Sequence, residues 1–278
     1  MVRKNLRYII WLLGILCVFL TLSTVLSYPW PVRDFNQEHP ITATLGEYRE
    51  DYRFHAGIDI GRGVGTPVYP VVSGIIERIV TTGDNAQVEV RGGSPPRLYR
   101  YIHIKPSSSL VKDQEVIAGV TLLGTVLQPS IDPQTGRPRF GPHLHFEEHL
   151  GEYNPLHPLR SVTDGGINPS PTQSNPPMVW PPEFRRHGTE GSNAVYYTKR
   201  VNNRILLYNT VDIITRAKDR FDGVNGGSAN VGLYRMDYRI VDESRGREFG
   251  PFQSFRFDSF QRTCSKPHSF HRYIQRQY

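Results

Sequence analysis

The chain has 278 residues, enough for two modest domains, and its many glycines and prolines favour strands and loops over long helices. The formal net charge of +7 arises at the two ends, because residues 1–27 and residues 260–278 contain basic side chains and no acids. The part between these ends is neutral overall, so the charge gives no support for a nucleic-acid partner.

The N-terminal segment combines a basic start with an apolar run from Ile9 onward. This pattern predicts an export signal or a signal anchor over residues 1–27, with the remainder of the chain exported. Val25 and Ser27 fit the small positions before a cleavage point, but the run is also nearly long enough to cross a bilayer uncleaved. We therefore expect a protein of the periplasm, the cell envelope or the extracellular space, free or anchored in the inner membrane through residues 8–27.

From about Ile41 to Pro158 the chain consists of short runs broken by glycine and proline, among them TPVYPVVSGIIERIV, AQVEVRG, LYRYIHI and VIAGVTLLGTVL. These runs have little helical periodicity and predict strands joined by hairpins. A mainly β domain is expected over residues 28–160.

The stretch RFHAGIDIGRGVGTPVYP places His55 and Asp59 four residues apart, with Gly57 between them. The even spacing lets both side chains reach the same side of an extended segment, and glycine permits a close backbone approach. Histidine and aspartate are zinc ligands, and a chain with so few cysteines must build such a site from them.

In LYRYIHI, strand alternation places His103 on the same face as Tyr99 and Tyr101 and away from Ile102 and Ile104. A histidine at the end of such a run is structural in most proteins. Its interest here comes only from the histidines elsewhere in the chain.

The stretch GPHLHFEEH, residues 141–149, carries two histidines on either side of a leucine. On a strand His143 and His145 share one face and Leu144 points to the other. Taken alone, the pair fits an exposed edge strand equally well. With the His–Asp motif upstream, one histidine of the pair gives three ligands and leaves a fourth position open, as in catalytic zinc sites, and the other is placed to move protons.

Together, FHAGIDIGRGVGTPVYPVVSGII, YIHI and GPHLHFE resemble the lysostaphin/LytM-type zinc metallopeptidases, which cut peptide bonds in bacterial peptidoglycan. The resemblance covers roughly residues 41–158 and implies a compact antiparallel β-sheet fold, a duplicated hybrid motif with a groove along it. It implies Zn²⁺ as the cofactor and peptidoglycan peptides as the substrate, and it leaves open which histidine of the catalytic pair is the general base. The implied zinc ligands are His55, Asp59 and His145, and the implied catalytic pair is His103 and His143.

Two departures from the family pattern stand beside these motifs: Ile102, where glycine is frequent, and an insert-like PSIDPQTGRPRF before the H-x-H strand. Glu147 and His149 continue the alternation of that strand. Support of a metal ligand is the alternative for Glu147, but we interpret both residues as structural. Contact with substrate is the alternative for Arg49, which we interpret as a surface residue.

The stretch SVTDGGINPSPTQSNPP has no apolar period and predicts a linker over residues 161–192. After it, VYYTKRV, RILLYNTVDIITRAKD and VGLYRMDYRIVD predict a small all-β, sandwich-like domain over residues 193–260, followed by a basic tail at 261–278. This domain is compatible with wall or partner binding, but the sequence indicates no protein partner and no oligomeric state.

The sequence therefore predicts an exported zinc endopeptidase that hydrolyses peptide cross-links of peptidoglycan in wall remodelling or lysis. The alternative is a catalytically silent relative that binds and regulates other wall hydrolases. Such relatives usually lack a metal ligand, whereas all five positions are filled here. A binding protein with incidental histidines would need three motifs to coincide by chance.

Overall fold

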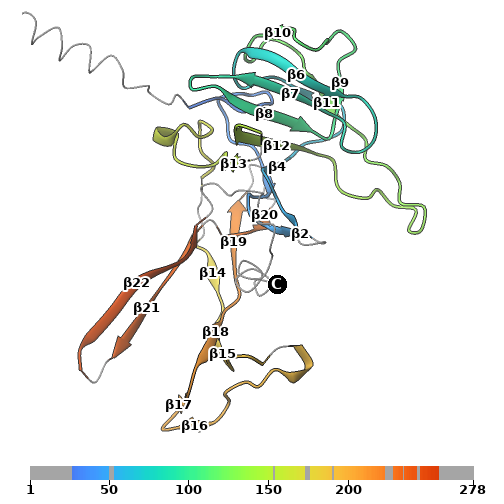
Figure 1. The fold of residues 1–278 in the computed structure, drawn as a ribbon. Coiled ribbons are helices and arrows are strands. Elements are labelled where there is room, and N and C mark those ends of the chain that lie inside the picture. Colours follow the sequence, from blue (N-terminus) through green and yellow to red (C-terminus); the bar gives the residue numbers. More distant parts are fainter. Residues whose placement is uncertain are drawn as a thin grey trace, which may run out of the picture.

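Figure 1 shows the computed structural model. Residues 1–26 of the predicted signal or anchor and the predicted basic tail at 261–278 lie outside the described residues. No helix within the described ranges combines the length and the apolar character that a membrane crossing needs. The structure describes residues 27–49, 53–152, 154–172, 176–189, 191–222, 228–233, 235–242 and 245–256.

The largest sheet has eight strands, which Figure 1 shows at the top of the molecule. Its ladders are all antiparallel, so the predicted mainly β, antiparallel fold is confirmed. In spatial order the strands are β1 (Ile41–Ala43), β4 (Ile58–Gly61), β12 (His143–Leu150), β8 (Arg97–Ile102), β7 (Gln87–Gly92), β6 (Gly74–Val80) and β10 (Glu115–Val116), and β13 (Asn154–Leu156) pairs with β12.

A three-stranded sheet, β5 (Pro67–Val68), β11 (Gly124–Val126) and β9 (Ile104–Pro106), shares one hydrophobic core with the large sheet. Val68 and Val126 from the small sheet and Val88 from β7 lie in the same buried cluster. The hairpin of β2 (Tyr48–Arg49) and β3 (Arg53–Phe54) precedes β4.

Strand β12 has one face in this core. Leu144 and Phe146 are fully buried, and the alternate residues His143, His145 and Glu147 point to the opposite face. Antiparallel pairing continues the same division into β4, where Ile58 lies opposite Phe146. The predicted alternation of the H-x-H strand is therefore confirmed.

The far end of β12 contains a buried charge cluster on its core face. Glu148 is completely buried and accepts hydrogen bonds from the hydroxyl of Tyr28 (2.6 Å), from Arg160 (2.6 and 2.8 Å) and from Arg97. Burial acts to lower the pKa of Arg160, but the hydrogen bonds to Glu148 raise it above its usual value. A fully paired buried carboxylate of this kind ties the chain at residues 28 and 160 to the central strand.

After residue 160 the described strands form small separate sheets, and the predicted β-sandwich is not confirmed. In these ranges Tyr238 and Ile240, alternate residues of the predicted strand VGLYRMDYRIVD, are about half exposed. The elements are η1 (Val162–Asp164), β14 (Met178–Val179), β15 (Glu183–Arg186), η2 (Gly191–Asn193), β16 (Arg200–Val201), β17 (Arg204–Ile205), β18 (Val211–Ile214), β19 (Ala217–Asp222), β20 (Ser228–Val231), β21 (Arg235–Asp242) and β22 (Arg247–Arg256), which pair as β14-β19-β20, β15-β18, β16-β17 and β21-β22.

Two residues from beyond the predicted peptidase domain lie in its core. Ile167, within the predicted linker, is fully buried and forms a bridge with Tyr28. Val231, within the predicted second domain, is buried in the same cluster. The domain boundaries stay a prediction, but the core of the first domain draws on residues on both sides of them.

Candidate active site

The pairing of β12 with β4 places two of the predicted metal ligands side by side. His145 lies directly opposite Asp59 in the antiparallel register, so the two side chains share the face that points away from the core. On the other face, the neighbouring residues Ile58 and Ile60 are fully buried. Alternation on two adjacent strands therefore fixes where the imidazole and the carboxylate meet.

The third predicted ligand, His55, comes from the turn between β3 and β4. Gly57 in this turn lies so close to β12 that a Cβ would stand 2.1 Å from the carbonyl oxygen of Phe146. Only glycine fits that approach, as the sequence predicts. The close passage brings His55 over the end of β12.

One ligand atom from each of these three residues meets at a single point. The Nε2 of His55 is 2.9 Å from Oδ1 of Asp59 and 2.8 Å from Nδ1 of His145, and that Nδ1 is 2.8 Å from the same carboxylate oxygen. All three side chains are buried. Within the described residues, they form the one cluster of this kind that can hold a metal ion.

The outer hydrogen bonds of the two histidines show which nitrogens face the cluster as acceptors. His55 donates from Nδ1 to the carbonyl oxygen of Thr44 (2.8 Å), and His145 donates from Nε2 to the carboxylate of Glu147 (3.0 Å). In the neutral imidazoles, Nε2 of His55 and Nδ1 of His145 then carry a lone pair and no hydrogen. Two lone pairs and a carboxylate oxygen at hydrogen-bond distance need a cation between them.

The electrostatics of the site agree with this requirement. Burial acts to lower the pKa of His145, but hydrogen bonds to Asp59 and Glu147 raise it to about 9. Burial acts to raise the pKa of Asp59, yet its hydrogen bonds with His145 and His55 hold it well below its usual range. The site thus stabilises positive charge, which a proton or a metal ion supplies.

The donor set also fits zinc. A tetrahedral ion with bonds of about 2.0–2.1 Å separates its ligand atoms by about 3.3 Å, so the three atoms would need to move apart by roughly half an ångström. Three protein ligands leave one tetrahedral position for water or substrate, as in catalytic sites.

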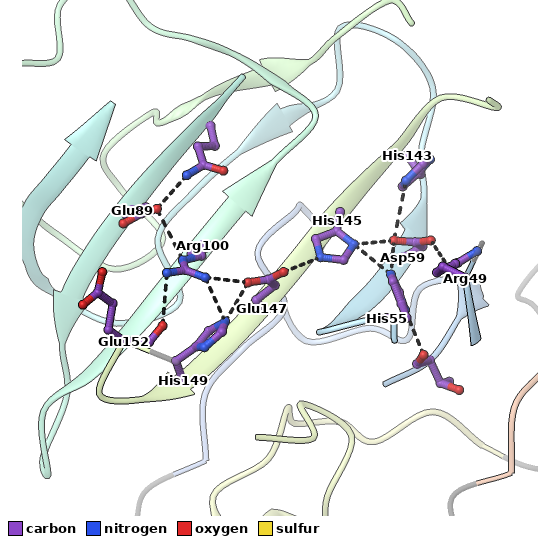
Figure 2. Close-up of polar contacts among 12 residues, drawn as sticks. Arg49, His55, Asp59, Glu89, Arg100, His143, His145, Glu147, His149 and Glu152 are labelled. Carbon is purple, nitrogen blue, oxygen red and sulfur yellow. Dashed lines mark hydrogen bonds and ion pairs between the residues drawn. The ribbon is translucent and has the colours of Figure 1, made fainter. Parts of the chain in front are cut away.

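Behind His145, a polar row continues along the same face of β12 (Figure 2). Glu147 lies between His145 and His149. One carboxylate oxygen of Glu147 faces His145, and the other, Oε2, lies 2.6 Å from Nε2 of His149 and 3.2 Å from Arg100. Glu89 in turn pairs with Arg100. Glu147, interpreted from sequence as structural, therefore contacts the predicted metal ligand His145 directly, and His149 contacts Glu147 in turn.

The predicted catalytic pair stands beside the metal-ligand cluster. The rings of His103 and His143 are 4.7 Å apart, and Nε2 of His143 is 3.5 Å from Oδ1 of Asp59. Each donates its Nδ1 hydrogen to a backbone carbonyl, His103 to Asp84 (2.6 Å) and His143 to Gly141 (2.7 Å). Both Nε2 atoms are thereby left as acceptors.

His103 reaches this position because its strand breaks. Continued alternation would put it on the face of Tyr101, which is fully buried in the core, and opposite Leu144. Instead His103 has φ 62°, a left-handed conformation, between the ends of β8 and β9. The predicted shared face with Tyr99 and Tyr101 is therefore wrong, and His103 lies beside His143 instead. Burial lowers the pKa of His103 to about 4.

Two further residues lie near the cluster, although the sequence predicts neither as a site residue. Phe140, at the end of the insert-like segment, packs its ring 4.7 Å from His103 and 5.3 Å from His143. Arg49, interpreted as a surface residue, lies 3.2 Å from Oδ2 of Asp59 while its side chain is 43% exposed. A strand pattern carries no information on either contact, because both come from loops or strand ends.

Residues 53–158 match the model of peptidase family M23. This segment contains all five predicted site residues and lies inside the range of the predicted resemblance. The match places residues 53–158 in peptidase family M23.

Three further comparisons accompany this match. An uncharacterized metalloprotease of Haemophilus influenzae is 32% identical over 137 residues, 48% of this chain, and the chain spans 25% of that relative's length. The catalytic domain of lysostaphin from Staphylococcus simulans has 24% identity and a TM-score of 0.34 over 41% of this chain and 83% of its own. A zinc-containing peptidase from Vibrio cholerae has 20% identity and a TM-score of 0.38 over 49% of this chain and 40% of its own. Both scores are low, so the family assignment rests on the match to the family model.

The first prediction separates the two histidines of β12 in the M23 domain. His145→Ala should lose most bound metal, because two ligands seldom hold zinc firmly, whereas His143→Ala should retain about one zinc ion per chain. Metal analysis of dialysed protein measures both. Loss of zinc from the His143 variant and retention by the His145 variant would mean that the roles are reversed.

The second prediction concerns Glu147. Glu147→Gln keeps the size of the side chain but removes the charge behind His145, so zinc affinity should fall by about tenfold to a hundredfold. Competition with a chromophoric chelator measures it. Glu77→Gln is the matched control, because Glu77 pairs with Arg91 on the surface of β6. Equal affinities for all three proteins would show that Glu147 does not support the ligand.

Proposed function

We propose that this protein is an exported zinc-dependent endopeptidase that hydrolyses peptide cross-links of bacterial peptidoglycan. The observation that carries the proposal is the meeting of His55, Asp59 and His145 at one point with His103 and His143 beside it. A silent, regulatory relative would not need acceptor nitrogens turned toward an open metal position.

A Zn²⁺ ion held by the three ligands would supply a Lewis acid that polarises the scissile carbonyl and lowers the pKa of water toward neutrality. The side chains that would transfer protons in this reaction are His103 and His143. Nε2 of His103 and Nε2 of His143 are each fixed as acceptors by a backbone carbonyl behind the ring. Either atom can take a proton from water and return it to the leaving amine.

The surroundings of the two rings suit this task. Burial keeps His103 neutral near pH 7, since its pKa is lowered to about 4, so its Nε2 is available as an acceptor. Phe140 packs on both rings and restricts their orientation. Rigid placement of the proton-transfer groups is what such a reaction needs.

The proposed substrate class rests on the three-motif resemblance to the lysostaphin/LytM peptidases, from which we expect peptidoglycan peptides as the substrate.

The third prediction is that the purified chain cleaves soluble muropeptides, as read by mass spectrometry. Chelation should abolish cleavage and zinc should restore it. His103→Ala and His143→Ala should each lower the rate by about 10²- to 10⁴-fold with zinc retained. A wild-type chain that binds zinc and cleaves no peptidoglycan peptide would favour the silent alternative.

Export is proposed from the N-terminal sequence alone, with residues 1–27 removed or kept as an inner-membrane anchor.

The fourth prediction is that a reporter fused after residue 256 is found outside the cytoplasm, and that deletion of residues 1–27 retains the reporter in the cytoplasm. A cytoplasmic reporter on the intact chain would contradict the proposal. The molecular mass of the exported chain distinguishes cleavage before Tyr28 from an anchor.

A further inference from the structure

A segment from beyond the M23 match lies against the turn at residues 44–47, which contacts the metal-ligand cluster. β20 packs against β1 at the edge of the large sheet, and Figure 1 shows it next to β2 and below β4. Val231, at the end of β20, and Leu233, just after it, are buried. Between them, Gly232 brings its backbone up to the turn that precedes β2.

The contact is made by one carboxylate. Oε1 of Glu47 accepts a hydrogen bond from the backbone NH of Gly232 (2.9 Å), one from the backbone NH of Thr44 (2.7 Å) and one from the hydroxyl of Thr44 (3.2 Å). Glu47 and Thr44 are both buried. A carboxylate with several donors at one oxygen holds the two backbone segments in fixed register.

The same turn holds a metal ligand. The carbonyl oxygen of Thr44 accepts from Nδ1 of His55, and the backbone NH of His55 donates to the carbonyl oxygen of Glu47 (both 2.8 Å). The other oxygen of Glu47 lies 3.8 Å from Arg49, which contacts Asp59. Glu47 therefore stands between the docked segment and two of the three ligands.

We infer that docking of residues 231–233 on Glu47 positions the metal ligands, so that a segment outside the M23 match sets the metal affinity of the site. Glu47 and Gly232 are positioning residues that act through Thr44 on the orientation of His55. This inference rests on the proposed metal site. Because coupling is reciprocal, metal binding in turn stabilises the docked segment.

Gly232 offers a way to weaken the contact without touching a ligand. A Cβ at this position would stand 2.8 Å from Cγ of Glu47, so Gly232→Ala must displace that side chain. The matched control is Gly63→Ala, since a Cβ at Gly63 meets nothing within 4 Å.

The experiment measures zinc affinity in the full chain by competition with a chromophoric chelator. Gly232→Ala should weaken binding by about tenfold to a hundredfold, as for loss of a group that orients a ligand, and Gly63→Ala should not change it. Glu47→Ala should weaken binding similarly. In the Glu47→Ala background, Gly232→Ala should cost nothing further, because the atom it strikes is absent.

The outcomes are separable. If the wild-type chain binds no zinc, the proposed metal site fails. If it binds zinc and Gly232→Ala binds equally well, or if the two substitutions are additive, the inference is overturned and the segment is only a structural cover. Should Gly232→Ala fail to fold, Glu47→Gln decides the matter, because it keeps the shape and weakens the charged acceptor: unchanged affinity overturns the inference, and a several-fold loss supports it.

Discussion

The alternation of side chains along β12 is the constraint from which the rest of the molecule follows. One face carries Leu144, Phe146 and Glu148 into the buried interior, and the other carries His143, His145, Glu147 and His149. A shift of the register by one residue would turn the histidines toward the hydrophobic core and the core side chains toward the site. The hydrophobic packing that stabilises the fold thus also determines the face of β12 on which the site histidines lie.

On the site face of β12, basic and acidic side chains alternate in a row, and the end of the row where Asp59 lies requires a cation. At the other end Arg100 lies against Glu147, Glu89 and the carbonyl oxygen of Glu152, so the carboxylate charge is compensated inside the protein. At the ligand end, by contrast, Asp59 and two acceptor nitrogens meet. A proton on His145 satisfies them in part, and a metal ion competes with that proton. The buried polar row therefore serves the ligand rather than the stability of the sheet.

Much of this arrangement follows from local sequence. The H-x-H spacing, the His–Asp spacing and Gly57 each predict a position that the structure confirms, because strand alternation and close approach are local properties. His103 could not be placed this way, since its left-handed φ interrupts the strand that the pattern continues. Nor could the contact of Glu47 with Gly232, which joins residues 185 positions apart in the chain. The role of Glu147 was predictable only in part: alternation predicts the strand face on which it lies, but not its hydrogen bond with His145.

The folded unit is larger than the segment that matches the family. Two segments that flank this match pair with each other: the backbone NH of Asn168 donates to Tyr28 (2.8 Å), and the indole of Trp30 donates to Pro169 (2.9 Å).

Tyr28 also binds Glu148 on the core face of β12, so this pairing closes the interior behind the site. Tyr28 follows Ser27 directly, at the end of the proposed export segment. The first described residues therefore belong to the interior itself, since Tyr28 and Trp30 are both buried.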